Sequence, residues 1–165
     1  ITAIEVAAAD SKRVYVGTEN GGIFRSINGG DSWSPNVSSS VLPGHTITRL
    51  VTHPQDANTL YATVANFGHS HVFRSRDGGT TWEDVDKKQL PDVPHHTALI
   101  RTDEPGKLYV GSDAGVFILD VQSGGWSNLT KNLPNAMVID LVYHLKDGTL
   151  SAATYGRSIW RIRLK

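Results

Sequence analysis

Cysteine is absent from the 165-residue sequence, which excludes a disulfide framework, a thiolate metal site and a cysteine nucleophile. Long apolar runs are also absent, and none approaches the roughly 18 residues that a membrane span requires. The 16 basic and 16 acidic residues give a formal net charge of +0 and form no run of one sign. Binding to nucleic-acid phosphates favours a basic excess. We therefore expect no membrane span and no nucleic-acid partner.

Glycine is abundant instead, with 16 residues, and valine, isoleucine, threonine and tyrosine recur in short alternating runs that favour strands. Four stretches of the chain align with one another: RVYVGTENGGIFRSINGGDSW, TLYATVANFGHSHVFRSRDGGTTW, KLYVGSDAGVFILDVQSGGW and TLSAATYGRSIWRIRL. In the first three, a phenylalanine precedes a tryptophan by a constant interval, and Trp160 takes the phenylalanine position in the fourth. The three pairs are Phe24 and Trp33, Phe73 and Trp82, and Phe117 and Trp126.

The tryptophans recur at intervals of about 40–50 residues, which is typical of propeller blades. A further apolar strand precedes each unit, at residues 1–8, 46–53, 97–104 and 137–145. The predicted fold class is therefore all-β, with β-propeller blades of four antiparallel strands and about four blades, a partial propeller. An antiparallel sandwich of the same strands is the alternative. The blades of this single domain, 1-165, are expected at about 1-40, 41-88, 89-131 and 132-165.

A short motif, SINGGDSW and then SRDGGTTW, occurs in the first two units. Its glycines permit the positive φ angles of a tight hairpin turn, and the preceding Asn or Asp can accept hydrogen bonds from the amides that follow it. The hydroxyl residues are placed to bond across the hairpin, and the tryptophan brings apolar surface onto the neighbouring layer. We therefore expect Trp33, Trp82 and Trp126 to occupy equivalent, mostly buried positions in successive blades. The motif therefore has a structural role, carried by Ser26, Asn28, Gly30, Ser32 and Trp33 in the first copy and by Ser75, Asp77, Gly79, Thr81 and Trp82 in the second.

These residues resemble the Asp-box (BNR-repeat) β-propeller family, which includes sialidase-like, sortilin-like and xyloglucanase-like proteins and photosystem II assembly factors. The third copy keeps Trp126 but has Leu119 and Val121 at the hydroxyl and carboxylate positions. The resemblance implies a propeller with more blades than four, and a secreted or periplasmic protein. We therefore expect the chain to be the C-terminal part of a larger propeller or a half that self-associates, and not to close as a four-bladed ring.

The second unit carries a longer loop, ANFGHSH, between its second and third strands. Ligands of propellers bind at loops of this kind, and an aromatic ring with neighbouring imidazoles is suited to stacking on a sugar and bonding its hydroxyls. The alternative is an ordinary exposed loop. Candidate ligand-binding residues on this face are Phe67, His69, His71, His96, Asp113, Tyr155 and Arg157.

Five histidines, His45, His69, His71, His95 and His96, fall on or near that face. His69 and His71 lie two residues apart, a spacing that would suit a transition metal on a strand. No carboxylate recurs beside them at ligand spacing, so solvated histidines without a metal or other cofactor are the favoured interpretation.

Catalytic residues are not selected by any motif. A glycosidase needs two carboxylates on opposite sides of a sugar, and the candidates are Glu19, Asp92, Asp113 and Asp140. A sialidase would need an arginine triad, for which Arg49, Arg101 and Arg157 are available. The leading hypothesis is a non-catalytic module that binds a glycan or protein partner through its loop face. The alternatives are a C-terminal fragment of a glycoside hydrolase and a scaffold or assembly factor.

Overall fold

The computed structural model describes residues 1–38, 41–42, 44–129 and 136–164, and within them the chain is all-β. The predicted blade boundaries near residues 40 and 131 lie outside the described residues. In the described part, the strands are β1 (Ala3–Val6), β2 (Val14–Gly17), β3 (Ile23–Ser26), β4 (Ile47–His53), β5 (Asp56–Val64), β6 (Val72–Ser75), β7 (Glu83–Asp84), β8 (His95–Ile100), β9 (Lys107–Ser112), β10 (Gly115–Asp120), β11 (Trp126–Asn128), β12 (Val138–His144), β13 (Thr149–Thr154) and β14 (Ile159–Arg163).

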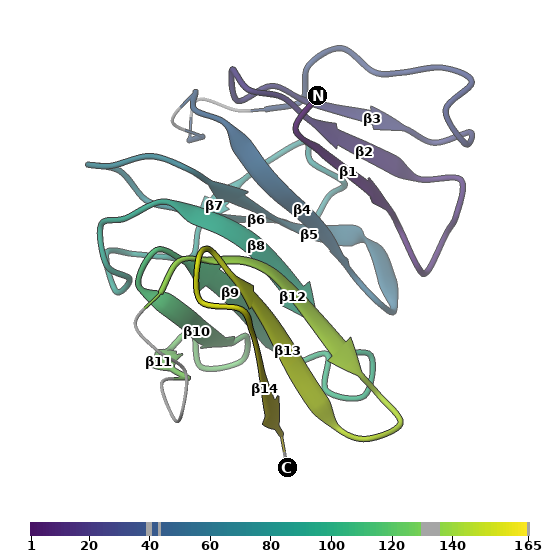
Figure 1. Ribbon diagram of the computed structural model, residues 1–165. Coiled ribbons are helices and arrows are strands. Elements are labelled where there is room, and N and C mark those ends of the chain that lie inside the picture. The colour runs from purple at the N-terminus through teal and green to yellow at the C-terminus, as the bar shows by residue number, and fades with distance from the viewer. Residues whose placement is uncertain (39–40, 43, 130–135, 165) are drawn as a thin grey trace.

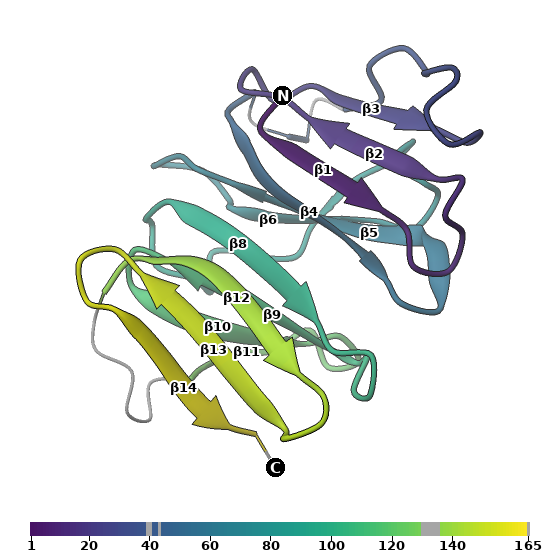
Figure 2. The same cartoon turned by 45° about the vertical axis from the view of Figure 1, so that its right-hand side comes forward.

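These strands form four antiparallel sheets, with the orders β1-β2-β3, β4-β5-β6-β7, β8-β9-β10-β11 and β12-β13-β14. The first strand of each sheet contacts the first strand of the next, so the sheets converge along β1, β4, β8 and β12. Figures 1 and 2 show the N-terminal and C-terminal sheets at opposite ends of this series. This arrangement confirms the predicted fold class, a partial β-propeller with a sheet for each repeat unit.

Strand register confirms the alignment of the four units. Phe24 pairs with Val16, Phe73 with Ala62 and Phe117 with Val110. Trp160 pairs with Ala152, so it occupies the phenylalanine position of the fourth unit, as the alignment predicts.

The first sheet has three strands, where the sequence predicts four. Residues 34–37 run beside β3, and the Ser34 and Val37 amides donate to the carbonyls of Arg25 and Ile23 at 2.8 and 2.7 Å. Pro35 has no N–H to donate. Side chains accept in place of backbone carbonyls, because the Arg25 amide donates to Ser34 Oγ and the Ile23 amide to Asn36 Oδ1. The segment therefore pairs with β3 without completing a regular ladder.

The two copies of the motif form turns with matching hydrogen bonds. We call residues 26–33 and 75–82 the first and second box turns. In the second, the Gly79 amide donates to Ser75 Oγ at 2.7 Å, and the Thr81 amide and hydroxyl donate to the Asp77 carboxylate at 2.8 and 2.7 Å. In the first, the Ser32 amide donates to Asn28 Oδ1 at 2.9 Å. The aspartate or asparagine side chain thus satisfies amides that no strand partner reaches.

The core lies between successive sheets. Tyr15 and Ile23 of the first sheet pack in one cluster with Phe73 and Trp82 of the second unit. The next cluster repeats this arrangement, with Tyr61 and Val72 of the second sheet against Phe117 of the third. The first and second sheets therefore each bury the aromatic face of the sheet that follows, whereas Trp160 of the fourth sheet is 39% exposed.

The three tryptophans differ in burial although their sequence positions match. Trp82 is 6% exposed, as predicted, whereas Trp33 is 44% exposed and Trp126 is half-buried. The prediction of equivalent buried positions is therefore wrong for Trp33. Trp33 lies on the outward face of the first sheet, beside Ile1, Val16 and Phe24. It is exposed because no described sheet covers that face.

Two glycines let adjacent sheets approach closely. A Cβ built on Gly17 would lie 2.6 Å from Ile47 Cγ2, and one on Gly111 would lie 2.8 Å from Val138 Cγ1. Both glycines occupy the same register position, opposite the start of the following sheet's first strand. Any side chain there would push the neighbouring sheets apart.

Substitution of Trp82 tests whether packing between sheets supplies the stability. Trp82→Ala is expected to lower the free energy of unfolding by about 3–5 kcal/mol, because a buried indole is removed from between two sheets. Trp33→Ala, at the same repeat position but exposed, is the matched control and should cost less than about 2 kcal/mol. Urea denaturation measures both, and equal losses for the two variants would contradict this account of the core.

Candidate functional site

The candidate site lies at the end of the second sheet where the ANFGHSH loop connects β5 to β6. Strands β5 and β7 run in the same direction, so both finish at the same end of the sheet. The segment between β7 and β8, residues 85–94, therefore lies beside this loop. Together they enclose a cavity of about 340 Å³, which we call the histidine cavity. It is lined by Gly68, His69, His71, Asp86, Lys88, Leu90 and Asp92.

His71 is the central side chain of this cavity, and it is only 2% exposed. Its Nδ1 atom lies 2.9 Å from Asp86 Oδ2. The Asp86 carboxylate also accepts the amides of His71 and Leu90, at 3.0 and 3.1 Å. Burial alone would raise the pKa of Asp86, but these hydrogen bonds outweigh it and lower the pKa below its ordinary value. Asp86 is therefore ionised, and it fixes the imidazole with Nδ1 as the donor.

The opposite nitrogen of that ring, Nε2, is buried and has no hydrogen-bond partner. In the tautomer with its proton on Nδ1, the ring presents the Nε2 lone pair to the cavity. Asp92 Oδ1 lies 3.4 Å away, and this carboxylate is held by the Gly68 amide at 2.6 Å. A ligand hydroxyl in the cavity can donate to Nε2, and a second hydroxyl can donate to Asp92.

His95, the first residue of β8, lies directly behind His71. The two ring centroids are 4.7 Å apart with an interplanar angle of 30°. His95 Nδ1 lies 2.7 Å from the Val93 carbonyl, and its Nε2 atom is buried without a partner. Burial, assisted by the nearby His71, lowers the pKa of His95 to about 4. His95 is thus neutral near pH 7 and supports the position of the His71 ring.

The rim of the cavity combines aromatic and charged side chains. Phe67 is 65% exposed at the tip of the loop, and His69 lies with its ring 5.9 Å from that of His45. Lys87 and Lys88 have φ angles of 50° and 60°, a backbone conformation that is strained for residues other than glycine. Phe67 precedes Gly68 of the cavity lining, so its exposed ring is available to stack on an apolar ligand face.

Two of the seven predicted ligand-binding residues, His69 and His71, line this cavity, and Phe67 lies in the same loop next to Gly68. His96 and Asp113 lie on the next sheet, where His96 Nε2 is 2.7 Å from Asp113 Oδ1. His96 is the extra residue of a bulge in β8, which turns its side chain out of the ladder. Tyr155 and Arg157 are exposed in the β13–β14 turn and do not line the histidine cavity.

The predicted catalytic carboxylates are not brought together as a pair. Asp92 lines the histidine cavity, Asp113 binds His96, and Asp140 lies beside a hollow on the outward face of the fourth sheet. Glu19 is exposed in the β2–β3 turn. Sequence reasoning missed Asp86, whose importance comes from its burial against His71, and neither its neighbours nor its spacing signals that contact.

The arginines proposed for a triad are also dispersed. Arg101 follows the last residue of β8, at the opposite end of the strand from the loop face. There it forms ion pairs with Asp103 and Glu104, both at 2.8 Å. Arg49 lies on β4 and Arg157 in the β13–β14 turn. Arg101 is therefore a structural residue between the third and fourth sheets, where it also bonds the Tyr143 hydroxyl at 2.9 Å.

Within the described ranges, no group of three or more histidine and carboxylate side chains is arranged to hold a metal ion. The same part of the chain contains no helix long and apolar enough to cross a membrane.

Comparison with known proteins relates the chain to several propeller families, although no protein-family model matches it. A xyloglucanase from a Paenibacillus species is 30% identical over 73% of this chain, which spans 14% of that enzyme. Vacuolar protein sorting/targeting protein 10 from Aspergillus terreus is 28% identical over 63% of this chain, which spans 7% of that protein's sequence. The chain therefore corresponds to a small part of each relative.

Solved structures agree with the fold. A GH74 xyloglucanase from Xanthomonas campestris superposes with a TM-score of 0.75 at 16% identity, over 97% of this chain and 28% of the enzyme. An auxiliary nutrient binding protein from Bacteroides thetaiotaomicron gives 0.74 at 14% identity, over 99% and 38% of the two chains. YCF48 bound to D1 peptide gives 0.65 at 14% identity, over 92% and 47%.

The lowered pKa of His95 makes the stability of the protein depend on pH. The unfolded chain protonates this residue near pH 6.5 but the native protein only near pH 4, so stability falls as the pH drops from 6.5 to 4. The loss from this residue is roughly 2–3 kcal/mol. Asp86, whose pKa is lowered, contributes stability that is lost only at more acidic pH.

Urea denaturation at successive pH values measures the effect. His95→Asn keeps a donor for the Val93 carbonyl but cannot ionise, so its stability should fall less across this range. His144→Asn, at an exposed histidine, should retain the full fall. A profile for His95→Asn that parallels the original chain would contradict the assignment.

Proposed function

We propose that this chain, which is similar to a xyloglucanase and to a vacuolar protein sorting/targeting protein, is a non-catalytic module binding a hydroxyl-rich ligand, a glycan, in the histidine cavity. The observation that carries the proposal is the buried Nε2 atom of His71, which lines a cavity of about 340 Å³ and has no hydrogen-bond partner, with Asp92 Oδ1 3.4 Å away. A buried polar atom without a hydrogen bond costs free energy unless a ligand or water bonds to it.

Three features of the cavity suit a saccharide. His71 Nε2 and Asp92 supply neighbouring acceptors for hydroxyl groups, and Lys88 supplies a donor. Phe67 supplies an exposed ring at the rim. Two of the similar proteins have names that point to ligands of this kind, a xyloglucanase and an auxiliary nutrient binding protein.

The alternative is that the chain is a fragment of a glycoside hydrolase. Its similarity to xyloglucanases supports this alternative at the level of the family. Asp86 and Asp92 share one cavity, as a catalytic pair would. However, a glycosidase needs one carboxyl group with a raised pKa to act as the acid. The pKa of Asp86 is lowered, and its oxygens accept hydrogen bonds from His71 and Leu90. Asp86 is therefore unsuited to the role of that acid.

His71→Asn tests the binding proposal. Asparagine retains an N–H for Asp86 but removes Nε2, so the ligand loses its central acceptor while the support of the loop remains. Binding on a glycan array, followed by calorimetry with a xyloglucan heptasaccharide or with the best glycan found, should weaken at least tenfold. His144→Asn is the control and should bind as the original chain does.

Two further results bear on the same proposal. Deleting residues 66–68, which shortens the loop toward the length of its repeat partners, should leave the fold intact and abolish binding. The chain should release no reducing ends from xyloglucan. Glycan binding that survives both His71→Asn and the deletion would overturn the proposed site, and xyloglucan hydrolysis lost in Asp92→Asn would favour the hydrolase alternative.

For the domain organisation, we propose that further blades of the same repeat cover the outward faces of the first and fourth sheets. Trp33 is exposed where its counterpart Trp82 is buried by a preceding sheet. On the fourth sheet, Ile159 is 72% exposed at the position that Ile23 occupies, fully buried, in the first. Both faces thus present the surfaces that elsewhere pack between blades.

In the 165-residue chain, a second copy can supply the missing neighbours, since blades pack head to tail. We expect concentration-dependent dimers by analytical ultracentrifugation at micromolar concentration. Ile159→Glu should shift the chain to monomers, whereas Leu145→Glu, at an exposed residue of the β12–β13 turn, should not. A chain that remains monomeric throughout, or dimers unaffected by Ile159→Glu, would contradict self-association through these faces.

A further inference from the structure

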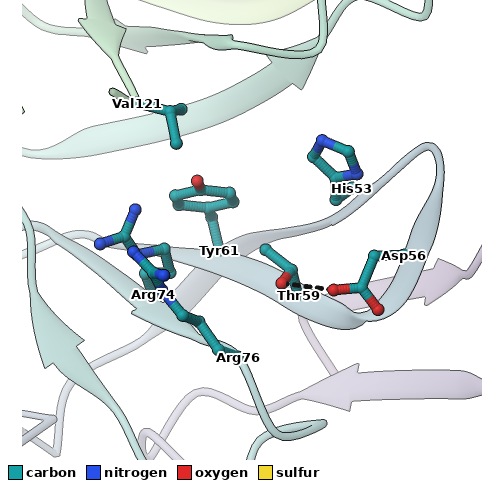
Figure 3. Close-up of a pocket in the computed structure, with 7 residues that line it drawn as sticks. All are labelled: His53, Asp56, Thr59, Tyr61, Arg74, Arg76 and Val121. Carbon is teal, nitrogen blue, oxygen red and sulfur yellow. Dashed lines mark hydrogen bonds between the residues drawn. The ribbon is translucent and has the colours of Figure 1, made fainter. Parts of the chain in front are cut away.

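A second cavity, of about 210 Å³, lies between the second and third sheets, at the opposite end of the strands from the histidine cavity. We call it the arginine cavity, and Figure 3 shows its lining side chains. They are His53, Asp56, Thr59, Tyr61, Arg74, Arg76 and Val121. His53 is the last residue of β4 and Asp56 is the first residue of β5, whereas the ANFGHSH loop follows the other end of β5. The two cavities are therefore separate.

In the equivalent groove between the first and second sheets, an arginine side chain donates hydrogen bonds to the following blade. There Arg25 Nη1 donates to the backbone carbonyls of Gly78 and Asp77, at 2.8 and 3.4 Å, in the second box turn. The Tyr15 hydroxyl donates to the Ala57 carbonyl at 2.8 Å. Two carbonyl oxygens of the following blade, those of Asp77 and Gly78, thus accept hydrogen bonds from the Arg25 guanidinium.

Arg74 occupies the same register position in the second sheet, because it pairs with Tyr61 as Arg25 pairs with Tyr15. The following blade lacks the motif, and Val121 stands where Asp77 stands in the second box turn. In Figure 3, Val121 approaches Tyr61 from across the cavity and offers only methyl groups near the guanidinium. Where carbonyl oxygens of a box turn accept from Arg25, the arginine cavity lies beside Arg74.

Both arginines of the cavity keep donors available. Arg74 Nε lies 2.6 Å from Glu83 Oε1, and Arg76 Nε lies 3.4 Å from the same oxygen. These contacts use the Nε atoms, so Glu83 does not take the paired Nη groups. Arg74 also has a hydrogen-bond interaction with Tyr61, which helps to raise its pKa. In Figure 3 the two guanidinium groups lie side by side next to the Tyr61 ring. Paired N–H groups of arginine match the geometry of a carboxylate.

The other polar groups of the cavity leave room for an anion. His53 Nδ1 accepts the Gln55 amide at 3.2 Å, which places the ring proton on Nε2 as a further donor. The Asp56 carboxylate accepts the Thr59 hydroxyl at 2.7 Å and the Asn58 amide at 2.9 Å. These bonds lower the pKa of Asp56 and satisfy its charge locally.

We propose that the arginine cavity binds a carboxylate group, received by the Nη atoms of Arg74 and Arg76 with His53 at the rim. The carboxylate replaces the two carbonyl oxygens that the preceding groove obtains from a box turn. Its bearer is a small organic acid or an acidic sugar, two sources with the same binding chemistry. This site is additional to the histidine cavity and does not depend on what binds there.

The test uses NMR titration of the ¹⁵N-labelled chain, observing the Nε–H signals of arginine and the ring of His53. The probes are succinate and glucuronate, each paired with an uncharged analogue, succinamide and glucose. We expect saturable shifts at Arg74, Arg76 and His53 with at least one acid, at millimolar concentration, and none with the analogues. Response to succinate alone identifies a small acid, and response to glucuronate alone identifies an acidic sugar.

Two variants and two controls complete the experiment. Arg74→Gln should weaken binding at least tenfold, and Val121→Asp should block it by placing a carboxylate inside the cavity while leaving Arg74 in place. Arg25→Gln removes the matched arginine of the preceding groove and His71→Asn alters the other cavity, so both should bind the acid unchanged. No saturable shift with either acid, an equal response to the uncharged analogues, or full binding by folded Val121→Asp would overturn the proposal.

Discussion

Packing of one sheet on the aromatic face of the next is the interaction on which the rest of this structure depends. Tyr15 and Ile23 cover Phe73 and Trp82, and Tyr61 and Val72 cover Phe117 in the same manner. The isolated sheets are small, with three or four strands each, and could not bury their apolar faces alone. The repeat therefore stabilises pairs of blades, and a residue's burial depends on the neighbouring blade as much as on its own unit.

The histidine cavity is a consequence of this stacking. Its loop comes from the second sheet, whereas the imidazole that supports His71 belongs to the first strand of the third. The Thr48 hydroxyl of β4 donates to the His95 carbonyl at 2.6 Å and fixes the two sheets together beside the site. The connection between the sheets adds Asp86 and Asp92. A rigid junction of two blades thus positions groups that are distant along the chain.

Departures from the repeat create both cavities. Where the motif is complete, its polar atoms are satisfied within the protein, as with Asp77 in the second box turn and the carbonyl of Gly78 with Arg25. The added residues of the ANFGHSH loop open the histidine cavity, and Val121 in place of an aspartate leaves the arginine cavity beside Arg74. The regular parts of the repeat build the scaffold, and its irregular parts leave polar groups available to ligands.

The sequence by itself determined the fold class, the four repeat units, the position of Trp160 and the turn chemistry of Ser75 and Asp77. These follow from local spacing and from bonds within a few residues. It also indicated the loop that forms the histidine cavity. Only the tertiary structure decided that Trp33 is exposed, that Asp86 orients His71, and that Arg74 lines the arginine cavity. Each of these depends on which side chain of another blade lies opposite, and such contacts join residues whose separation along the chain carries no periodic signal.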